Sequence, residues 1–297
     1  MSIKVEIDQD SGFCAGVQRA IKLAEKELKI SGKLYCLGEI VHNHPELDRM
    51  KALGLEVINY DEFKKLRNVK VLIRAHGEPP EIFTIARENQ IEIINTTCPI
   101  VSKLQEKISK VYQESRLKGG NIFIYGKQDH PEVRALLGQT DGKAKVIRNL
   151  SELGEAWINE PVYLYSQTTM NQQGYEELIS GISEKINTAG HDPGKMVKVN
   201  NTICRYVSHR QSGIEEFARY HEMILFVSSK ESSNGKVLFE HCKSINPESF
   251  FITDVDDIKH IPLGKISSIG ICGATSTPRW LLKKVRLAVN QQIGVNN

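Results

Sequence analysis

The sequence predicts an α/β protein built from parallel β-sheets with helices on their faces. Short runs rich in β-branched residues alternate with amphipathic helical stretches along nearly the whole chain. Such alternation is typical of parallel sheets, in which each strand is joined to the next by a crossover helix. About nine strand–helix units exceed one comfortable sheet, so we expect two or three small α/β lobes. No low-complexity segment or long Pro/Gly linker separates the units, so short turns should join the lobes.

The first expected strand, 4–7, leads into a helix over 17–30, where Val17, Ile21 and Leu28 recur at helical spacing. In the third unit a proline pair at 79–80 is well placed to begin a helix. The remaining strand–helix units, in chain order, are 33–40 with 45–54, 69–75 with 79–90, 91–97 with 100–120, 121–126 with 131–139, 162–167 with 172–186, 196–203 with 205–220, 223–229 with 235–245, and 266–274 with 278–293.

Three lobes of similar size result if the chain is divided near residues 98 and 204. We therefore predict lobe 1 over 14–97, lobe 2 over 98–200 and lobe 3 over 201–297, with the N-terminal strand within 1–13 joining lobe 3. Sequence similarity between the lobes is too weak to define a repeat.

Composition places the protein among ordinary globular chains and excludes several functions. The 297 residues are 40% hydrophobic and 25% charged, and the net charge is only +3 with both signs mixed, so nucleic acid is not an expected partner. The N-terminus lacks the apolar stretch of a signal peptide, and no apolar run approaches membrane-span length. We expect a cytoplasmic protein whose six cysteines are thiols, metal ligands or catalysts and do not form disulfides.

Chemically active residues gather where the expected strands end. Ligands of open parallel sheets bind beyond the carboxyl ends of the strands. Here nearly every such end carries Cys, His, Glu, Ser, Thr or Asn, while the chain contains neither a Walker A sequence nor G-x-G-x-x-G. The strand ends read GFCAG, GEIVHN, RAHGEPP, NTTCP, GKQDHPEV, SQTTMN, NTICR, SSKESSN and GATSTP.

Three of the six cysteines occupy strand–helix junctions: Cys14, Cys98 and Cys204, each in a different third of the chain. A helix N-terminus favours thiolate over thiol, which makes a reactive or metal-binding sulfur. Three thiolates suit a [4Fe–4S] cluster with one iron left open. Two other interpretations of these cysteines are ligands of a catalytic zinc ion and three unrelated structural thiols. The other three cysteines, Cys36, Cys242 and Cys272, lie inside apolar strands or a helix, where a buried structural thiol is expected.

Taken in order, the motifs resemble those of the 4-hydroxy-3-methylbut-2-enyl diphosphate reductase family, which catalyses the last step of the non-mevalonate isoprenoid pathway. Any one motif is weak, but the ordered set is specific and spans nearly the whole chain. The matching stretches are GFCAGVQRAI (12–21), GEIVHN (38–43), RAHG (74–77), TCPIVSK (97–103), HPEV (130–133), SQTT (166–169), NTIC with RQ (201–204, 210–211), SSN (232–234) and TSTP (275–278).

The resemblance implies three α/β lobes in a pseudo-threefold arrangement around a central [4Fe–4S] cluster, held by Cys14, Cys98 and Cys204. The open iron would receive the C4 hydroxyl of an allylic diphosphate, and an electron donor protein such as ferredoxin or flavodoxin would supply electrons to a monomeric enzyme. Glu132 would deliver a proton beside His130 and Thr168 at the hydroxymethyl end. The residues matching the diphosphate-binding set are His42, His76, Ser232, Ser233, Asn234 and Ser276.

The chemistry of such a reaction is consistent with these residue types. Hydroxide is a poor leaving group, so a Lewis-acidic iron and a nearby acid would both lower the barrier to its departure. No strand end has a Lys/Arg cluster, which leaves helix N-termini with hydroxyl and amide donors to bind the diphosphate. Plain N-capping is the alternative role for Ser232 and Ser276, and a first-turn glutamate is the alternative role for Glu132.

Two other functions stay open at this point: a non-catalytic iron–sulfur redox sensor and a zinc-dependent hydrolase of a phosphorylated substrate. The chain also departs from the usual family pattern, which puts contacts around the site and redox tuning in doubt. The departures are Arg205, Tyr206 and Val207 after the third cysteine, His209, Gln105, Lys127, Ala135 and Ala274.

Overall fold

The computed structural model describes residues 3–264 and 266–294, and it forms three four-stranded sheets flanked by helices. The predicted α/β class with three parallel-sheet lobes is confirmed. Sheet A contains β1 (Lys4–Ile7), β10 (Met223–Val227), β11 (Ser249–Ile252) and β12 (Ser268–Gly273). Sheet B contains β2 (Leu34–Leu37), β3 (Leu55–Ile58), β4 (Lys70–Ile73) and β5 (Glu92–Asn95). Sheet C contains β6 (Asn121–Tyr125), β7 (Lys145–Ile147), β8 (Val162–Ser166) and β9 (Val197–Val199).

The three sheets share one topology, which sequence similarity did not reveal. Sheet B has the order β3-β2-β4-β5, sheet C the order β7-β6-β8-β9, and sheet A the order β11-β10-β12-β1. In sheets B and C the second strand along the chain is one edge, and the first and third strands are central; in sheet A, β11 takes the edge place and β10 and β12 take the central places. The N-terminal strand β1 completes sheet A as its other edge, pairing in parallel with β12 so that Val5 lies opposite Ile269.

The described residues contain more strands than the nine expected, because one edge strand of each sheet was missed in the sequence. The missed strands are β3, β7 and β11. Each is only three or four residues long, and β3 and β7 each have an exposed residue, so their apolar patterns are too short to stand out. They are followed by short helical turns in place of long amphipathic helices: α3 (Tyr60–Lys65), η1 (Leu150–Glu152) and η2 (Val255–His260).

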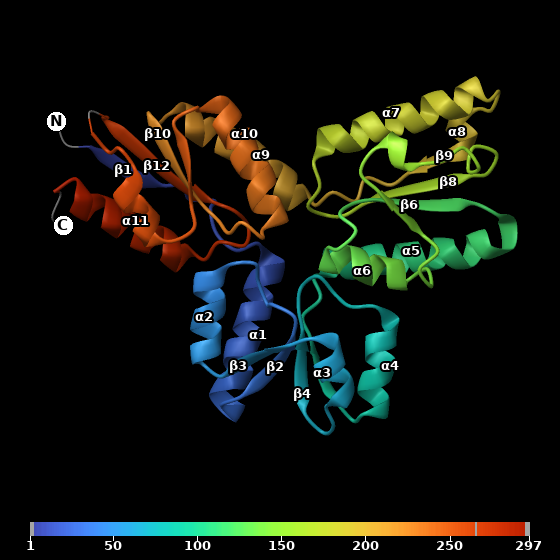
Figure 1. Cartoon of the computed structure of the whole chain (residues 1–297), viewed down its shortest axis with the longest axis horizontal. Coiled ribbons are helices and arrows are strands. Elements are labelled where there is room, and N and C mark those ends of the chain that lie inside the picture. Colours follow the sequence, from blue (N-terminus) through green and yellow to red (C-terminus); the bar gives the residue numbers. More distant parts are fainter. Residues whose placement is uncertain (1–2, 265, 295–297) are drawn as a thin grey trace. The chain divides into compact units, whose positions relative to one another are not determined.

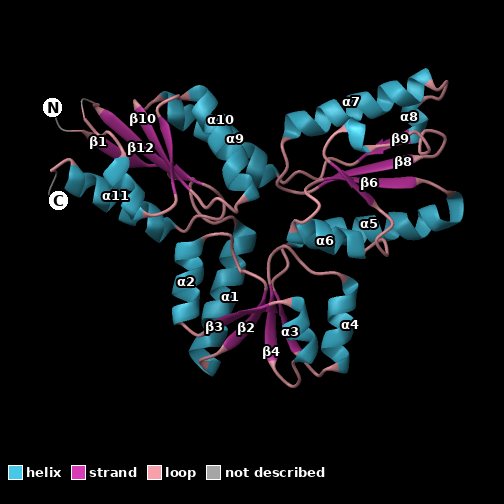
Figure 2. Ribbon diagram, viewed as in Figure 1, coloured by secondary structure: helices cyan, strands magenta, loops and turns pink. Residues whose placement is uncertain are grey.

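Helices cover both faces of sheets A and C, which buries the apolar strands on both sides. In sheet C, Phe123 and Leu164 pack with Tyr175 of α7 (Gln172–Thr188) on one face. On the other face Ile124 packs with Ile108 of α5 (Pro99–Lys118) and with α6 (Pro131–Gly138) (Figure 1). In sheet A, α9 (Arg205–Arg219) and α10 (Ser233–Ile245) cover one face and α11 (Arg279–Gln292) the other (Figure 2). The remaining helices are α1 (Ala15–Ser31), α2 (His44–Ala52), α4 (Pro80–Glu88) and α8 (Pro193–Met196).

The backbone divides into two compact units. Unit 1 consists of Met1–Leu34, Glu39–Val57 and Arg205–Asn297, and it holds sheet A with α1 and α2. Unit 2 consists of Tyr35–Gly38 and Ile58–Cys204, and it holds sheet C with most of sheet B. The lobe boundaries 14–97, 98–200 and 201–297 stay a prediction.

Candidate functional site

The three junction cysteines occupy equivalent positions at the start of a long helix. Cys14 is the residue before α1, Cys98 the residue before α5 and Cys204 the residue before α9. Each follows an edge strand, since β1, β5 and β9 precede them in the chain. Neither Cys14 nor Cys98 caps its helix through the side chain. The strand–helix junctions predicted for these three residues are therefore confirmed.

The backbone of each junction cysteine is fixed by the same hydrogen bond. The N–H of Cys14 donates to the carbonyl of Thr275 at 3.0 Å, that of Cys98 to Ala75 at 3.0 Å, and that of Cys204 to Thr168 at 2.9 Å. Each acceptor lies two residues beyond the end of the neighbouring strand, which is β12, β4 or β8. The same backbone hydrogen bond thus places a half-buried cysteine beside the carboxyl end of each sheet.

Each of these carbonyls also lies next to a residue predicted to bind substrate. Thr275 precedes Ser276, and Ala75 precedes His76. Thr168 is itself one of the predicted residues. The hydrogen bond from the cysteine N–H therefore fixes the loop that carries the predicted substrate-binding residue.

The other three cysteines lie in the interior, as predicted. Cys36 in β2, Cys242 in α10 and Cys272 in β12 are fully buried. Burial raises the pKa of Cys36 to about 12, and the pKa of Cys272 is also raised, first by its hydrogen bond with Cys242 and then by burial. Cys36 and Cys272 are therefore held as neutral thiols, which are poor metal ligands.

In unit 1 the first turn of α10 gathers buried hydroxyl and amide groups. Ser232 caps the helix by accepting from the N–H of Gly235 at 3.0 Å, and its Oγ lies 2.9 Å from the Oγ of Ser276. The side-chain amide of Asn234 donates to Thr275 Oγ1 at 2.7 Å. Ser232 thus has the capping role named as its alternative, whereas Ser276 caps no helix because α11 begins after Pro278.

Two atoms in this turn are buried without a hydrogen-bond partner. They are Oγ of Ser233, a residue only 7% exposed, and Oδ1 of Asn234, a residue 4% exposed. A polar atom buried in this way is unfavourable unless a ligand or water completes it. Together with the N-terminal dipole of a 13-residue helix, these groups suit an anion with several oxygen atoms.

His42, the remaining predicted diphosphate ligand of unit 1, lies in the loop before α2. Its Nδ1 is 3.4 Å from the carboxylate of Glu39, and this contact is the main reason that the pKa of Glu39 is lowered. Asn43 caps α2 by accepting from the N–H of Glu46 at 3.1 Å. The cap holds the chain next to His42 in an extended conformation.

In unit 2 Glu132 is buried against Thr168. The Oε1 of Glu132 accepts from the N–H of Thr168 at 2.7 Å, and its Oε2 accepts from the Thr168 hydroxyl at 2.6 Å. Glu132 is 1% exposed, and this burial raises its pKa although the two bonds from Thr168 oppose the shift. Glu132 is the second residue of α6, and its carboxylate accepts two hydrogen bonds from Thr168 in the loop after β8, a contact that a first-turn glutamate does not need.

His130 and His76 lie close to each other in the same unit. His130 is the N-cap of α6, and its Nδ1 accepts from the N–H of Glu132 at 3.2 Å, which makes Nε2 the protonated nitrogen of the neutral ring. The two imidazole rings meet edge to face with their centroids 5.3 Å apart. Unit 2 therefore brings together six predicted residues: His76, Cys98, His130, Glu132, Thr168 and Cys204. Unit 1 holds the other six: Cys14, His42, Ser232, Ser233, Asn234 and Ser276.

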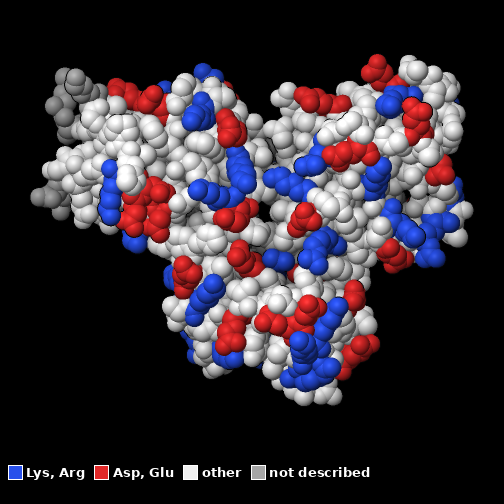
Figure 3. All heavy atoms as spheres, in the orientation of Figure 1, with Lys and Arg blue, Asp and Glu red and all other residues white. Residues whose placement is uncertain are grey.

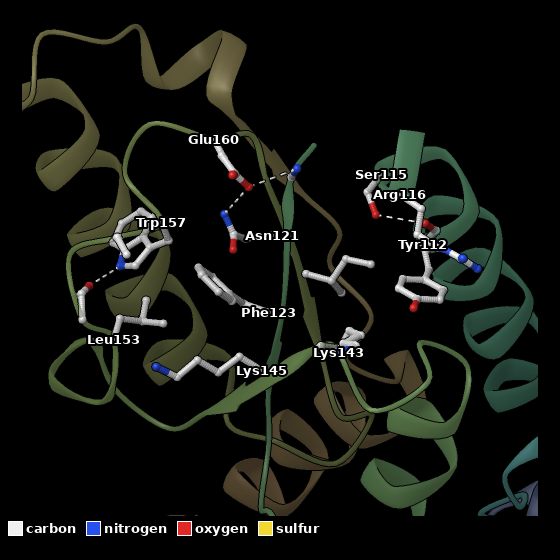
Figure 4. A pocket seen from close by; sticks show the side chains of 15 residues that line it. Tyr112, Ser115, Arg116, Asn121, Phe123, Lys143, Lys145, Leu153, Trp157 and Glu160 are labelled. Carbon is white, nitrogen blue, oxygen red and sulfur yellow. Dashed lines mark hydrogen bonds between the residues drawn. The ribbon is translucent and has the colours of Figure 1, made fainter. Parts of the chain in front are cut away.

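A cavity of about 480 Å³ in unit 2 lies away from the predicted site residues. Asn121 and Lys145, the first residues of β6 and β7, line it together with Phe123 and Trp157 (Figure 4). It therefore opens at the amino end of sheet C, while His130, Glu132 and Thr168 follow the carboxyl ends of the strands. None of the predicted site residues lines this cavity.

One buried polar cluster near Cys14 was missed in the sequence. Arg210 of α9 donates to Asp8 at 2.6 Å and to Ser11 at 3.0 Å, and Ser11 also accepts from the N–H of Gly273. These contacts join the loop between β1 and α1 to the end of β12. The only signal in the sequence was Arg210 within the RQ motif, because an ion pair between residues 202 positions apart leaves no local pattern.

The departures from the family pattern now have structural positions. Gln105 of α5 lies against Gly77, in the loop that carries His76, so closely that a Cβ at Gly77 would come within 2.6 Å of its amide nitrogen. Val207 is buried in α9. The N–H of Lys127 donates to the side chain of Gln167 at 3.1 Å, next to Thr168.

The surface agrees with the balanced composition. Basic and acidic side chains are intermixed over the face drawn in Figure 3. Every helix among residues 3–264 and 266–294 is too short or too polar to cross a lipid bilayer.

These features define a class: an α/β protein of three parallel sheets in which helix starts carry cysteine, histidine and serine, with the buried carboxyl group of Glu132 among them. The family model described as "LytB protein" matches residues 5–290. The chain therefore belongs to the LytB family, which contains the 4-hydroxy-3-methylbut-2-enyl diphosphate reductases. The resemblance inferred from the motifs is confirmed.

Relatives of established name share about half of their residues with this chain. The 4-hydroxy-3-methylbut-2-enyl diphosphate reductase of Bacteroides fragilis is 49% identical over 291 residues, covering 98% of this chain and 99% of its own. That of Porphyromonas gingivalis is 50% identical, covering 95% and 97%. A solved structure of (E)-4-hydroxy-3-methyl-but-2-enyl diphosphate reductase, described as the terminal enzyme of the non-mevalonate pathway, has a TM-score of 0.71 at 32% identity, covering 98% of this chain and all of its own. The Plasmodium falciparum E-1-hydroxy-2-methyl-but-2-enyl-4-diphosphate reductase, at 23% identity, shares the fold with a TM-score of 0.81, covering 96% and 87%.

Proposed function

We propose that the protein is an iron–sulfur reductase that removes the C4 hydroxyl group of (E)-4-hydroxy-3-methylbut-2-enyl diphosphate. The C–O bond breaks, the hydroxyl group takes up one proton and leaves as water, and two electrons with a second proton replace it on the carbon skeleton. The products are isopentenyl and dimethylallyl diphosphate. A protein such as ferredoxin or flavodoxin supplies the electrons.

The observation that carries the proposal is the double role of Thr168. Its N–H and hydroxyl donate to Glu132, and its carbonyl accepts from the N–H of Cys204. One residue thus connects a buried acid of raised pKa to a cysteine at a helix start. A purely regulatory iron–sulfur protein has no need of such an acid, and this favours catalysis over the sensor function.

Three residues hold or transfer protons in this reaction. Burial favours the neutral form of Glu132, so the carboxyl group keeps a proton to a higher pH and can give it to the departing hydroxyl group. Thr168 keeps that carboxyl group in one orientation. His130 presents its Nε2–H as a hydrogen-bond donor to the hydroxymethyl end of the substrate.

The diphosphate is bound by neutral donors and histidines. Ser232, Ser233 and Asn234 offer buried hydroxyl and amide groups at the start of α10, and the hydroxyl of Ser276, in the loop after β12, lies 2.9 Å from that of Ser232. The two unpartnered atoms at the start of α10 support an oxygen-rich ligand. His42 and His76 complete the set. Because the donors belong to helix starts and short loops, they are ordered before the substrate arrives, which reduces the entropy lost on binding.

Cys14, Cys98 and Cys204 are the residues that would hold a [4Fe–4S] cluster with one iron open. The donor set fits, because of the six cysteines in the described part of the chain these three alone stand at helix starts, where the dipole favours thiolate. When bound, the cluster supplies one-electron transfer and a Lewis-acidic iron at its open position.

The deciding experiment is substrate-dependent reoxidation of the reduced protein, purified under anaerobic conditions. We expect iron and acid-labile sulfide with broad visible absorption, and oxidation that starts only when the allylic diphosphate is added. Zinc in place of iron would support the phosphate-ester hydrolase instead. An iron–sulfur protein that the substrate fails to reoxidise would be a sensor, and the proposed reaction would be wrong.

A further inference from the structure

A polar cluster in unit 2, in which Arg74 and Glu78 are buried and Arg134 is exposed, has none of the roles described above. Tyr60, the first residue of α3, donates a short hydrogen bond from its hydroxyl group to Oε2 of Glu78. The Nε of Arg74 lies 3.6 Å from the other carboxylate oxygen, Oε1. The guanidinium of Arg134 in α6 stacks over the Tyr60 ring, 4.3 Å from its centroid. We call these four residues the Tyr60–Glu78 cluster.

Burial of the charged pair Arg74 and Glu78 costs desolvation free energy that apolar side chains in the same place would not. The side chains of Arg74 and Glu78 are only 7% and 1% exposed, and burial raises the pKa of Glu78 although Tyr60 and Arg74 oppose the shift. Burial likewise raises the pKa of Tyr60 to about 12, so its hydroxyl group stays a donor at physiological pH. A hydrophobic group in place of a buried ion pair is often as stable or more so. The cluster therefore has a reason other than stability.

The four residues join two segments that carry predicted substrate contacts. Arg74 and Glu78 flank His76 in the loop between β4 and α4, whereas Arg134 is one helical turn after His130. Glycines permit close packing on both sides of this junction. A Cβ at Gly38 would lie 2.5 Å from the Arg74 guanidinium, and one at Gly138 would lie 2.5 Å from Pro79.

We propose that the Tyr60–Glu78 cluster is a positioning device that sets the spacing between His76 and His130. The edge-to-face contact of their rings is the geometry that it maintains. This inference rests on the proposed function, in which His76 contacts the diphosphate and His130 the hydroxymethyl end. Among the described residues the cluster forms no hydrogen bond or ion pair with the Glu132 carboxylate, which is oriented by Thr168.

Tyr60→Phe tests the inference, because it keeps the ring under Arg134 and removes only the hydroxyl group. The KM for the allylic diphosphate and the inhibition constant of inorganic diphosphate should both rise, by up to about tenfold if the free energy of the lost hydrogen bond to Glu78 passes into diphosphate binding. The kcat should fall by less than KM rises, because Thr168 still orients the Glu132 carboxylate even when His130 moves. Arg134→Lys keeps the charge but loses the flat stack on an exposed residue, and it should raise KM about two- to fivefold.

Tyr112→Phe is the matched control, because its hydroxyl group also donates to a carboxylate, Asp141 at 3.1 Å, in a position away from the site. It should leave both constants unchanged. If Tyr60→Phe and Arg134→Lys behave like this control, or lower kcat and stability with KM unchanged, the cluster is only structural and the inference is wrong. If the wild-type protein neither turns over the allylic diphosphate nor binds inorganic diphosphate, the proposed function fails, and the inference fails with it.

Discussion

Replacement of Glu132 by glutamine should separate proton delivery from binding and folding. Glutamine can keep both contacts with Thr168: its oxygen accepts from the N–H now bonded at 2.7 Å, and its amide donates to the hydroxyl oxygen now at 2.6 Å. The size and hydrogen bonds of the side chain are retained, and only the acidic proton is lost. Turnover should therefore fall by about 10²–10⁴-fold, the usual contribution of a positioned acid.

The assay is substrate-dependent oxidation of a reduced dye under anaerobic conditions, with iron content and visible spectrum measured on the same sample. Both should match the wild-type protein, because Glu132 is not a proposed ligand. A wild-type rate in the glutamine variant would refute the role of Glu132 as proton donor. Loss of iron together with activity would show that the residue supports the cluster site instead.

Stability supplies an independent check on the same variant. Because burial raises the pKa of Glu132 in the folded protein, the unfolded chain releases its proton first as the pH rises above the ordinary value of about 4.3. The stability from the protonated carboxyl group is fully present below that pH and is lost as the pH rises through the folded pKa. Glutamine has no proton to lose, so the variant does not share this loss. The free energy of unfolding of the variant minus that of the wild type should therefore be larger at pH 8 than at pH 4. A pH-independent difference would argue against a raised pKa.

Four other substitutions test the remaining assignments. Cys98→Ser should lose bound iron and activity, whereas Cys36→Ser should retain both and change only stability; the reverse result in iron analysis would overturn the ligand assignment. Asn234→Ala should raise KM by roughly tenfold to a hundredfold, the value of a hydrogen bond to a charged group, with the iron content unchanged. An unaltered KM would mean that Asn234 does not bind the diphosphate. Arg210→Met leaves Asp8 buried without its charge partner, so urea titration should show a loss of about 3–5 kcal/mol, and a smaller loss would mean that Asp8 is solvated.

Much of the fold was predictable because its elements have strong local periodicity. The long helices beginning after Cys14, Cys98 and Cys204 have clear apolar faces, and the central strands are continuous apolar runs. The edge strand β7 was missed because three residues, one of them exposed, give no periodic signal. The common strand order of the three sheets was also hidden, because it depends on pairing between distant segments such as β1 and β12.

The candidate site residues could be named from the sequence where a motif contains them, whereas the contacts around them could not. Glu132 and Thr168 were both named from motifs, yet the hydrogen bonds between them join positions 36 residues apart. Tyr60 lies in no motif, and only the structure shows that its hydroxyl group reaches Glu78. Sequence patterns describe what one element does by itself, whereas a buried hydrogen bond between elements depends on the folded chain.

The hydrogen bond shared by the three junction cysteines also has a consequence for assembly of the holoenzyme. The N–H of each cysteine is anchored to a carbonyl at the end of an adjacent strand, so the sheets themselves determine where the thiol-bearing backbone lies. A classical zinc finger, in contrast, orders its ligands only when the metal arrives. We therefore expect the apoprotein to keep its native secondary structure and to accept iron and sulfide as a preorganised scaffold. A cluster lost from the site would then be replaced by refilling it, with no need to refold the chain.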